Sequence, residues 1–224
     1  MRKFAVIGLG RFGQKLATAL TMSEAEVIAI DQNREIVEQI RDQVSLAVRL
    51  DSTDEVALRS QGVDKVDVAI VGIGQGGRSF ESSILTVVNL KTMGVPLIYA
   101  RAESLIQGQV LSKVGATEVI YPEIESAQRW AYKLITPQIT DKLDFAPGYS
   151  IASMAAPESF NEQTVMDLQL RQKYRVNLVS IKRGRKSGSI DEIINVPLAE
   201  TLIYEGDILM VAGRDVDLAR LPHE

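Results

Sequence analysis

The chain has 224 residues, of which 46% are hydrophobic, and its formal net charge is −4 at pH 7. This length suits one large domain or two small ones, and the acidic balance argues against nucleic acid as the main partner. The absence of cysteine excludes disulfides and thiolate metal sites, and the single histidine, His223, is the penultimate residue, where a catalytic role is not expected.

The first predicted element is a buried strand at residues 4–7, followed by a glycine turn and a helix. Gly8, Gly10 and Gly13 have the spacing G-x-G-x-x-G, which in this context is typical of a dinucleotide-binding fingerprint. The first glycine permits the tight turn, the second lets the backbone approach a pyrophosphate, and the third lets the helix pack on the sheet. Phosphates would face free N–H groups at the positive end of the helix dipole. The alternative is a glycine-rich turn in an ordinary α/β protein.

Two side chains of this region add to the interpretation. Asp31 ends a second predicted strand and lies 18 residues beyond Gly13, where a carboxylate can accept both ribose hydroxyls of an adenosine and would repel a 2′-phosphate. The alternative for Asp31 is a helix N-cap. Arg11 lies inside the glycine turn, where a guanidinium can bind phosphate oxygens in a bidentate manner; alternatively it only covers the exposed side of the turn.

Further candidate site residues follow the next predicted strands, at residues 45–50, 68–71 and 97–100. Asp51 and Ser52 either border the adenine or cap the next helix. Gly72 and Gly74 belong to a glycine-rich loop, residues 72–77, which we expect over the crevice where strand order reverses; a flexible connection is the alternative. Arg101 either reaches a phosphate or is a solvated end residue.

The later elements complete an α/β pattern. An apolar helix at residues 80–93 is expected to be buried, in part by another subunit. After a sixth strand at 118–121, Glu123 falls in the first turn of a helix, where the helix dipole favours acids. Six strands alternating with helices predict a Rossmann-like doubly wound parallel sheet.

The predicted domain organisation has three parts. The Rossmann nucleotide-binding domain covers residues 1–135, and residues 136–147 form a linker. Residues 148–224 form a small α+β domain, with strands at 149–154, 176–182 and 208–212, a helix near 164–173 and an exposed hairpin turn at 183–188. The apolar runs are too short to span a membrane and no signal peptide precedes the first strand, so we expect a cytosolic protein.

The whole layout resembles a known family. Four segments resemble those of the cytosolic regulatory subunits of Ktr/Trk-type potassium transporters. They are the stretch FAVIGLGRFG, which includes Arg11 and Phe12, the helix start Tyr121-Pro122-Glu123 after the sixth strand, the run DLQLRQKY at 167–174 and the run EGDIL at 205–209. These subunits are built from RCK domains (regulator of K⁺ conductance). The resemblance covers essentially the full chain.

The resemblance implies a regulatory subunit that is not an enzyme. Family members form homo-oligomeric rings, dimers assembling into an octamer, beneath a membrane potassium channel subunit, so this chain would be cytoplasmic and peripheral at the inner face of the cell membrane. An adenine nucleotide, ATP/ADP in the Ktr branch or NAD/NADH in the Trk branch, sets the shape of the ring. The resemblance also implies that Arg11 contacts phosphate, that Glu123 holds a divalent cation between subunits, and that cyclic di-AMP binds between two C-terminal domains near Arg171 and Pro197.

Two other classes of function remain as alternatives. A small NAD-dependent oxidoreductase would need a proton donor or acceptor near the hydride, and the chain offers neither a central histidine nor a tyrosine followed four residues later by lysine. A nucleotide-dependent DNA-binding repressor is disfavoured by the acidic charge balance. The sequence does not decide between ATP/ADP and NAD/NADH, because Asp31 would recognise the ribose that they share.

Overall fold

The computed structural model describes residues 2–74, 79–183 and 192–222. The chain divides into two compact units, residues 1–125 and 126–224, and each unit has its own hydrophobic core. Helix α6 (Pro122–Ile135) contains the boundary between them. Among the helices of the described residues, none combines the length and the apolar character that crossing a membrane requires.

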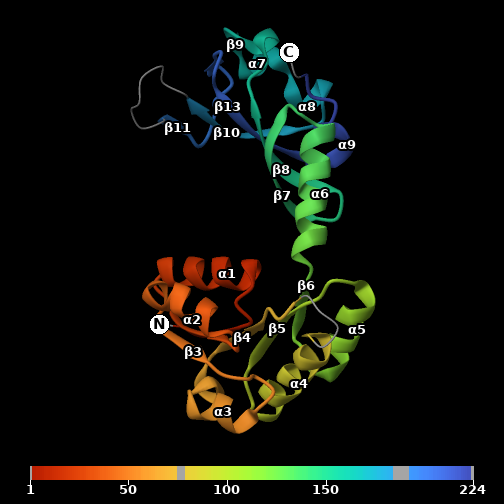
Figure 1. Ribbon diagram of the computed structural model, residues 1–224. Coiled ribbons are helices and arrows are strands. Elements are labelled where there is room, and N and C mark those ends of the chain that lie inside the picture. The colour runs from red at the N-terminus through yellow and green to blue at the C-terminus, as the bar shows by residue number, and fades with distance from the viewer. Residues whose placement is uncertain (1, 75–78, 184–191, 223–224) are drawn as a thin grey trace. The chain divides into compact units, whose positions relative to one another are not determined.

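The first unit is built on a parallel sheet of six strands in the order β3-β2-β1-β4-β5-β6 (Figure 1). The strands are β1 (Lys3–Ile7), β2 (Glu26–Asp31), β3 (Leu46–Arg49), β4 (Val68–Val71), β5 (Leu97–Arg101) and β6 (Glu118–Ile120). The helices are α1 (Arg11–Met22), α2 (Arg34–Ile40), α3 (Glu55–Ser60), α4 (Ser79–Thr92) and α5 (Leu105–Val114), with short 3-10 turns η1 (Arg41–Gln43) and η2 (Val63–Lys65). The predicted doubly wound parallel sheet is therefore confirmed.

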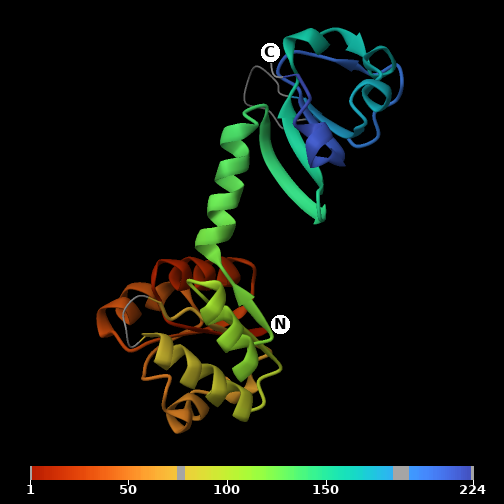
Figure 2. The same ribbon diagram turned by 90° about the vertical axis from the view of Figure 1, so that its right-hand side faces the viewer.

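Both faces of this sheet are covered by helices (Figures 1 and 2). Side chains of a strand point alternately to opposite faces, so Val6 of β1 packs with α1 and α2, whereas Ala5 and Ile7 pack with α3, α4 and α5. Burial on both faces explains why β1, β2 and β4 read as continuous apolar runs. The chain proceeds outward from β1 in one direction and from β4 in the other, which places the switch point of the topology between these two strands.

The second unit is an antiparallel sheet of five strands in the order β11-β10-β13-β8-β7, with a small separate two-stranded sheet. The strands of the large sheet are β7 (Ile139–Ala146), β8 (Tyr149–Ala155), β10 (Asn177–Arg183), β11 (Glu192–Ile194) and β13 (Ile208–Arg214). The remaining elements are the paired strands β9 (Gln163–Thr164) and β12 (Leu202–Ile203), the helices α7 (Val165–Leu168), α8 (Leu170–Lys173) and α9 (Asp215–Leu218), and the turn η3 (Glu158–Phe160). This agrees with a small C-terminal α+β domain.

Two sequence expectations for the second unit are wrong in detail. The linker expected at residues 136–147 is largely strand β7, an edge strand whose residues pair with β8. The single helix expected near residues 164–173 is two short helices, because Gln169 adopts a left-handed backbone with φ of 48° and ends the first of them. The predicted hairpin turn lies, beyond Arg183, outside the described residues, as does His223.

Helices α4 and α6 are among the helices that leave large apolar side chains exposed in a single chain. In α4 the side chains of Val87 and Leu90 are fully buried, but Leu85 is 51% exposed, so this helix is covered on one side only. In α6 Trp130 is 53% exposed and Leu134 is 76% exposed. The single chain therefore buries α4 only in part, and the expected cover by another subunit stays a prediction.

Candidate nucleotide-binding site

The loops after β1 and β4 touch at the carboxyl edge of the parallel sheet. Gly8 has φ of +90°, a conformation that favours glycine. A Cβ atom on Gly8 would lie 2.6 Å from the backbone nitrogen of Ile73, and one on Gly72 would lie 3.1 Å from the carbonyl oxygen of Gly8. Glycine at these two positions therefore lets the two loops pack backbone against backbone at the switch point.

Gly13 and Gly10 have opposite surroundings in the same turn. A Cβ atom on Gly13 would overlap the carbonyl oxygen of Gly8, so glycine is needed here for α1 to lie against the turn. At Gly10, by contrast, a Cβ atom would meet no atom within 4 Å, and φ is an ordinary −64°. Neither packing nor the backbone conformation of the chain accounts for the glycine at position 10, whereas a ligand close to the backbone would.

Helix α1 begins at this open position without a side-chain cap. Gly10 is its N-cap, no side chain accepts a hydrogen bond from the first turn, and the first turn carries no acidic residue. The N–H groups of the first helical residues have no partner within the helix, so they give this end a partial positive charge. Arg11 is exposed beside it, while Phe12 is partly buried and packs against the core cluster that includes Val6.

The carboxylate of Asp31 stands at the end of β2 and holds the glycine turn. Its Oδ2 accepts a hydrogen bond from the Leu9 N–H at 2.7 Å, and its Oδ1 accepts one from the Asn33 N–H at 2.8 Å. The cap of α2 is Asn33, whose side chain accepts from the Glu35 N–H, so the capping interpretation of Asp31 is wrong. Each carboxylate oxygen has capacity for a further hydrogen bond, which ribose hydroxyls would use.

Asp51 and Ser52 occupy the loop after β3, but neither caps the next helix. Asp54 caps α3 by accepting from the Ala57 N–H at 3.0 Å. Asp51 accepts hydrogen bonds from the backbone and side chain of Thr53, which hold the pKa of its carboxyl below the usual range. Ser52 is buried and its hydroxyl lies 2.7 Å from that of Thr86 in α4. That Asp51 and Ser52 border the adenine of a bound nucleotide stays a prediction.

Arg101 and Glu123 are partners of each other. Nη2 of Arg101 lies 2.6 Å from Oε1 of Glu123 in the first turn of α6 and 3.6 Å from Oε1 of Glu103. The guanidinium lies so close to Gly74 that a Cβ there would overlap its Nη1. Since only 10% of the Arg101 side chain is exposed, this arginine is not a solvated end residue, and binding a phosphate would require it to leave Glu123.

The structure gives no separate support for a metal ion at Glu123. Within the described residues no cluster of three or more His, Cys, Asp or Glu side chains is arranged to hold a metal. Instead, Oε1 of Glu123 accepts a hydrogen bond from Nη2 of the positively charged Arg101. The residues of one chain therefore do not fit a divalent cation at this position.

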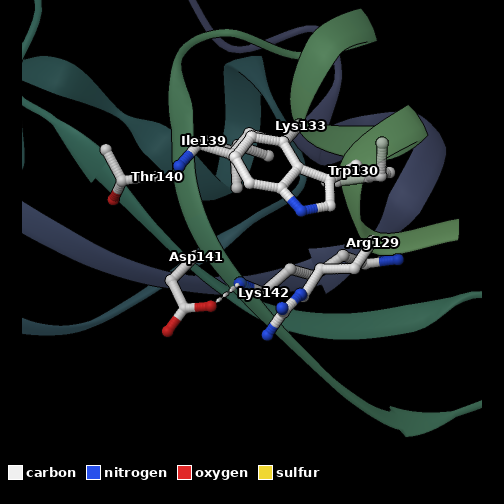
Figure 3. A pocket seen from close by; sticks show the side chains of 8 residues that line it. Arg129, Trp130, Lys133, Ile139, Thr140, Asp141 and Lys142 are labelled. Atoms are coloured by element: carbon white, nitrogen blue, oxygen red, sulfur yellow. Dashed lines mark hydrogen bonds between the residues drawn. The ribbon is translucent and has the colours of Figure 1, made fainter. Parts of the chain in front are cut away.

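A cavity that the sequence did not indicate lies in the second unit, between α6 and β7 (Figure 3). Lys142 lies with Nζ 4.2 Å from the ring centre of Tyr132 and makes ion pairs with Asp144 and Asp215. Burial lowers the pKa of Lys142, but its hydrogen bonds to the two carboxylates outweigh this and the net pKa is raised. Burial also raises the pKa of Tyr132, whose hydroxyl makes no hydrogen bond to the described residues. The ion pair of Lys142 with Asp215 joins distant parts of the chain, which is why no local pattern indicated it.

Comparison with known proteins identifies the family. The model of the TrkA-N domain matches residues 4–122, and that of the TrkA-C domain matches residues 155–221. The chain is 37% identical to Ktr system potassium uptake protein C of Bacillus subtilis over 98% of its own length and 95% of the relative's. The chain belongs to the TrkA-domain family of potassium-uptake proteins. It is also 31% identical to Ktr system potassium uptake protein A of the same organism, over 100% of this chain and 96% of the relative.

Solved structures with the same fold include RCK domains. The RCK domain of GsuK aligns with a TM-score of 0.63 and 18% identity, over 97% of this chain and 46% of that chain. The GsuK channel bound to NAD aligns with a TM-score of 0.59 and 17% identity, over 97% of this chain and 38% of that chain. The resemblance to Ktr/Trk regulatory subunits is thus confirmed, and homology to Ktr proteins favours a regulatory role over an oxidoreductase.

Proposed function

We propose that this chain is a nucleotide-sensing regulatory subunit that gates a membrane potassium channel or transporter through ligand-dependent conformations of a homo-oligomeric ring. One observation carries the nucleotide part of this proposal. Of the glycines in the fingerprint, Gly8 and Gly13 are required by contacts within the chain, whereas Gly10 borders open space at an uncapped helix start. A pyrophosphate close to the backbone explains this glycine.

Each candidate residue then has a separate task. The uncapped N-terminus of α1 binds phosphate oxygens through its N–H groups, and Arg11 adds charge-assisted bonds from the exposed side of the turn. Asp31 accepts hydrogen bonds from the ribose while it holds the turn through Leu9. A carboxylate at this position repels a 2′-phosphate, so the proposed ligands are ATP/ADP or NAD/NADH rather than NADP.

Switching requires that two nucleotides differ in their interaction with two states of the protein. A guanidinium that contacts only the part common to ATP and ADP stabilises both complexes equally. If Arg11 also reaches the γ-phosphate, it adds binding free energy to the ATP complex alone. We therefore assign to Arg11 the discrimination between the two nucleotides.

Assembly and the channel partner follow from homology and from the exposed apolar side chains. The Ktr relatives are potassium uptake proteins, and a regulatory subunit acts on a membrane subunit of such a system. Leu85 on α4 of the first unit and Leu134 on α6 of the second unit are each exposed in the single chain, and burying such side chains against another copy would favour contacts between subunits. We propose dimers that assemble into an octameric ring at the inner face of the membrane.

No catalytic step forms part of the proposal, and no step depends on a cation at Glu123. A divalent cation there would have to displace Arg101 and take further ligands from a nucleotide or another subunit. Cyclic di-AMP remains a proposed ligand of the second unit near Arg171 and Pro197, and it would be tested by direct titration of the full chain.

Calorimetric titration of the purified chain with ATP, ADP, NAD and NADH tests the nucleotide site. Asp31→Ala removes two charge-assisted hydrogen bonds, each worth about 1.5–3 kcal/mol, so the affinity should fall by about ten-fold or more. Glu38→Ala, at an exposed acidic residue of α2, is the matched control and should bind like the parent chain. A folded Asp31→Ala chain of unchanged affinity would disprove the ribose assignment.

The regulatory part is tested in vesicles that contain the membrane subunit of the same potassium-uptake system. Addition of the chain should make potassium flux depend on which nucleotide is present. An oxidoreductase would instead consume NADH in the presence of a substrate and leave the flux unchanged.

A further inference from the structure

The loop between β3 and α3, residues 50–54, lies beside the part of the proposed nucleotide site that would bind the ribose. The Leu50 N–H donates a hydrogen bond of 3.1 Å to the carbonyl oxygen of Asp31 at the end of β2. In the sheet order, β1 leads into the glycine turn, β2 carries Asp31, and β3 is the next strand outward. A nucleotide whose phosphates face the turn and whose ribose is bound by Asp31 would therefore place its base against this loop.

Helix α4 holds this loop through two polar side chains. Nδ2 of Asn89 lies 2.9 Å from the carbonyl oxygen of Thr53 and 3.4 Å from that of Ser52. Because both neighbours are carbonyl acceptors, the amino group of Asn89 is the end that faces the loop. Three residues earlier in the helix, the hydroxyl of Thr86 lies 2.7 Å from the hydroxyl of Ser52. Directional hydrogen bonds, and not apolar packing alone, therefore fix the loop on α4.

The hydroxyl pair lies in surroundings that favour apolar residues. Thr86 is fully buried and Ser52 is 7% exposed, while the neighbouring side chains Val87 and Leu90 of α4 belong to the hydrophobic core. A buried hydroxyl costs folding free energy unless it has a hydrogen-bond partner. A valine at position 86 paired with an apolar residue at position 52 would suit this core, so packing does not account for the two hydroxyls, whereas the need for one fixed arrangement of the loop does.

The loop keeps hydrogen-bonding groups for a ligand. Asp51 is exposed, and both hydrogen bonds that it accepts from Thr53 end on Oδ1, so they leave Oδ2 unused. The backbone N–H of Ser52 donates to no residue in the part of the chain that the structure describes. Adenine carries an amino donor at the position where guanine carries a carbonyl acceptor. A carboxylate held at a fixed place beside the base therefore distinguishes the two purines.

We propose that Thr86 and Asn89 of α4 are positioning residues for the base of the bound nucleotide and that they determine how strongly the site prefers adenine. The inference rests on the proposed nucleotide site. Neither side chain has to touch the base, since each acts through Ser52 or Thr53. With the loop already ordered, Asp51 accepts a hydrogen bond from the amino group of adenine without a further entropy cost on binding. With the loop released from α4, that cost returns and the preference for adenine falls.

Calorimetric titration of the full chain with two nucleotides that differ only in the base tests the proposal. The two are ATP and GTP, or NAD and nicotinamide guanine dinucleotide, according to which class the parent chain binds. Thr86→Val and Asn89→Leu nearly keep the size of each side chain and remove its hydrogen-bonding groups. Each should lower the preference for the adenine nucleotide by about five-fold, as expected for one lost hydrogen bond, and leave the affinity for the guanine nucleotide nearly unchanged.

Two variants of matched chemistry serve as controls. Thr86→Ser keeps the hydroxyl and should retain the preference for adenine. Thr92→Val makes the same exchange as Thr86→Val at an exposed position of α4 and should bind both nucleotides like the parent chain. Urea unfolding of each variant distinguishes a chain that fails to fold from a folded chain that has lost its base preference.

The results separate this inference from the proposed function. A parent chain that binds neither class of nucleotide contradicts both. A parent chain that binds nucleotides without preferring adenine overturns the inference alone, as does a full preference for adenine in both Thr86→Val and Asn89→Leu. Equal losses of preference in Thr86→Ser and Thr86→Val would overturn the role of the hydroxyl. If Thr86→Val does not fold, Asn89→Leu decides, because the side chain of Asn89 is only partly buried.

Discussion

The contrast between Gly10 and Gly13 gives the most direct test of the nucleotide site. The side chain of a valine at position 10 meets no atom of the chain within 4 Å at its Cβ, and φ of −64° suits any residue. Replacing a glycine N-cap by valine costs about 1 kcal/mol, while the lower entropy of the unfolded chain returns about 0.4–1 kcal/mol. Gly10→Val should therefore change the free energy of unfolding by less than about 1 kcal/mol.

The same valine should prevent nucleotide binding, since it occupies the space next to the phosphates. We expect calorimetric affinity to fall by at least about ten-fold, which corresponds to about 1.4 kcal/mol. Gly13→Ala is the comparison variant, for which we expect a loss of stability. The Cβ atom of the new alanine would overlap the carbonyl oxygen of Gly8, and overpacking of this kind costs about 1–3 kcal/mol of folding free energy. It should lower stability measured by urea unfolding.

Two outcomes would refute the reasoning. Wild-type affinity in Gly10→Val would mean that the phosphates do not approach this turn. A loss of stability in Gly10→Val as large as that in Gly13→Ala would mean that the space at position 10 is not open in the folded chain.

Three further predictions concern Arg11, Asp217 and assembly. Arg11→Ala should lower the affinity for ATP more than the affinity for ADP, and it should weaken the dependence of potassium flux on the nucleotide. Equal losses of affinity for ATP and ADP with normal regulation of flux would mean that Arg11 only covers the exposed side of the turn. The pKa of Asp217 is lowered from 3.8 by Arg214, so its stabilising contribution is present above that pH and is lost as pH falls through the folded pKa. Urea unfolding at several pH values should show that Asp217→Asn is less stable near neutral pH and loses less stability between about pH 5 and pH 3; parallel curves would contradict this. Light scattering at micromolar concentration should show an oligomer without nucleotide, and a monomer would argue against contacts through Leu85 and Leu134.

The sequence predicted the elements whose cause is local. The apolar runs at β1, β2 and β4 predicted buried strands because each run is covered on both faces of the sheet. The spacing of Gly8, Gly10 and Gly13 predicted the turn, and contacts within the chain require glycine at Gly8 and Gly13 but not at Gly10. Strand β7 was missed, because at its exposed edge position only Ile139 is fully buried, which leaves no clear alternation to detect.

The tertiary structure decided which side chains are partners. Arg101 and Glu123 are 22 residues apart and appeared separately as a phosphate contact and a cation ligand, yet they form one ion pair. The hydroxyl of Ser52 meets that of Thr86, 34 residues away. Arg214 and Arg220 lie three residues from Asp217, whereas Arg175 comes near that carboxylate only through the pairing of β10 with β13. Local sequence determines a strand, a turn or a cap, because these depend on neighbouring residues, whereas contacts between side chains depend on the order in which the strands pair.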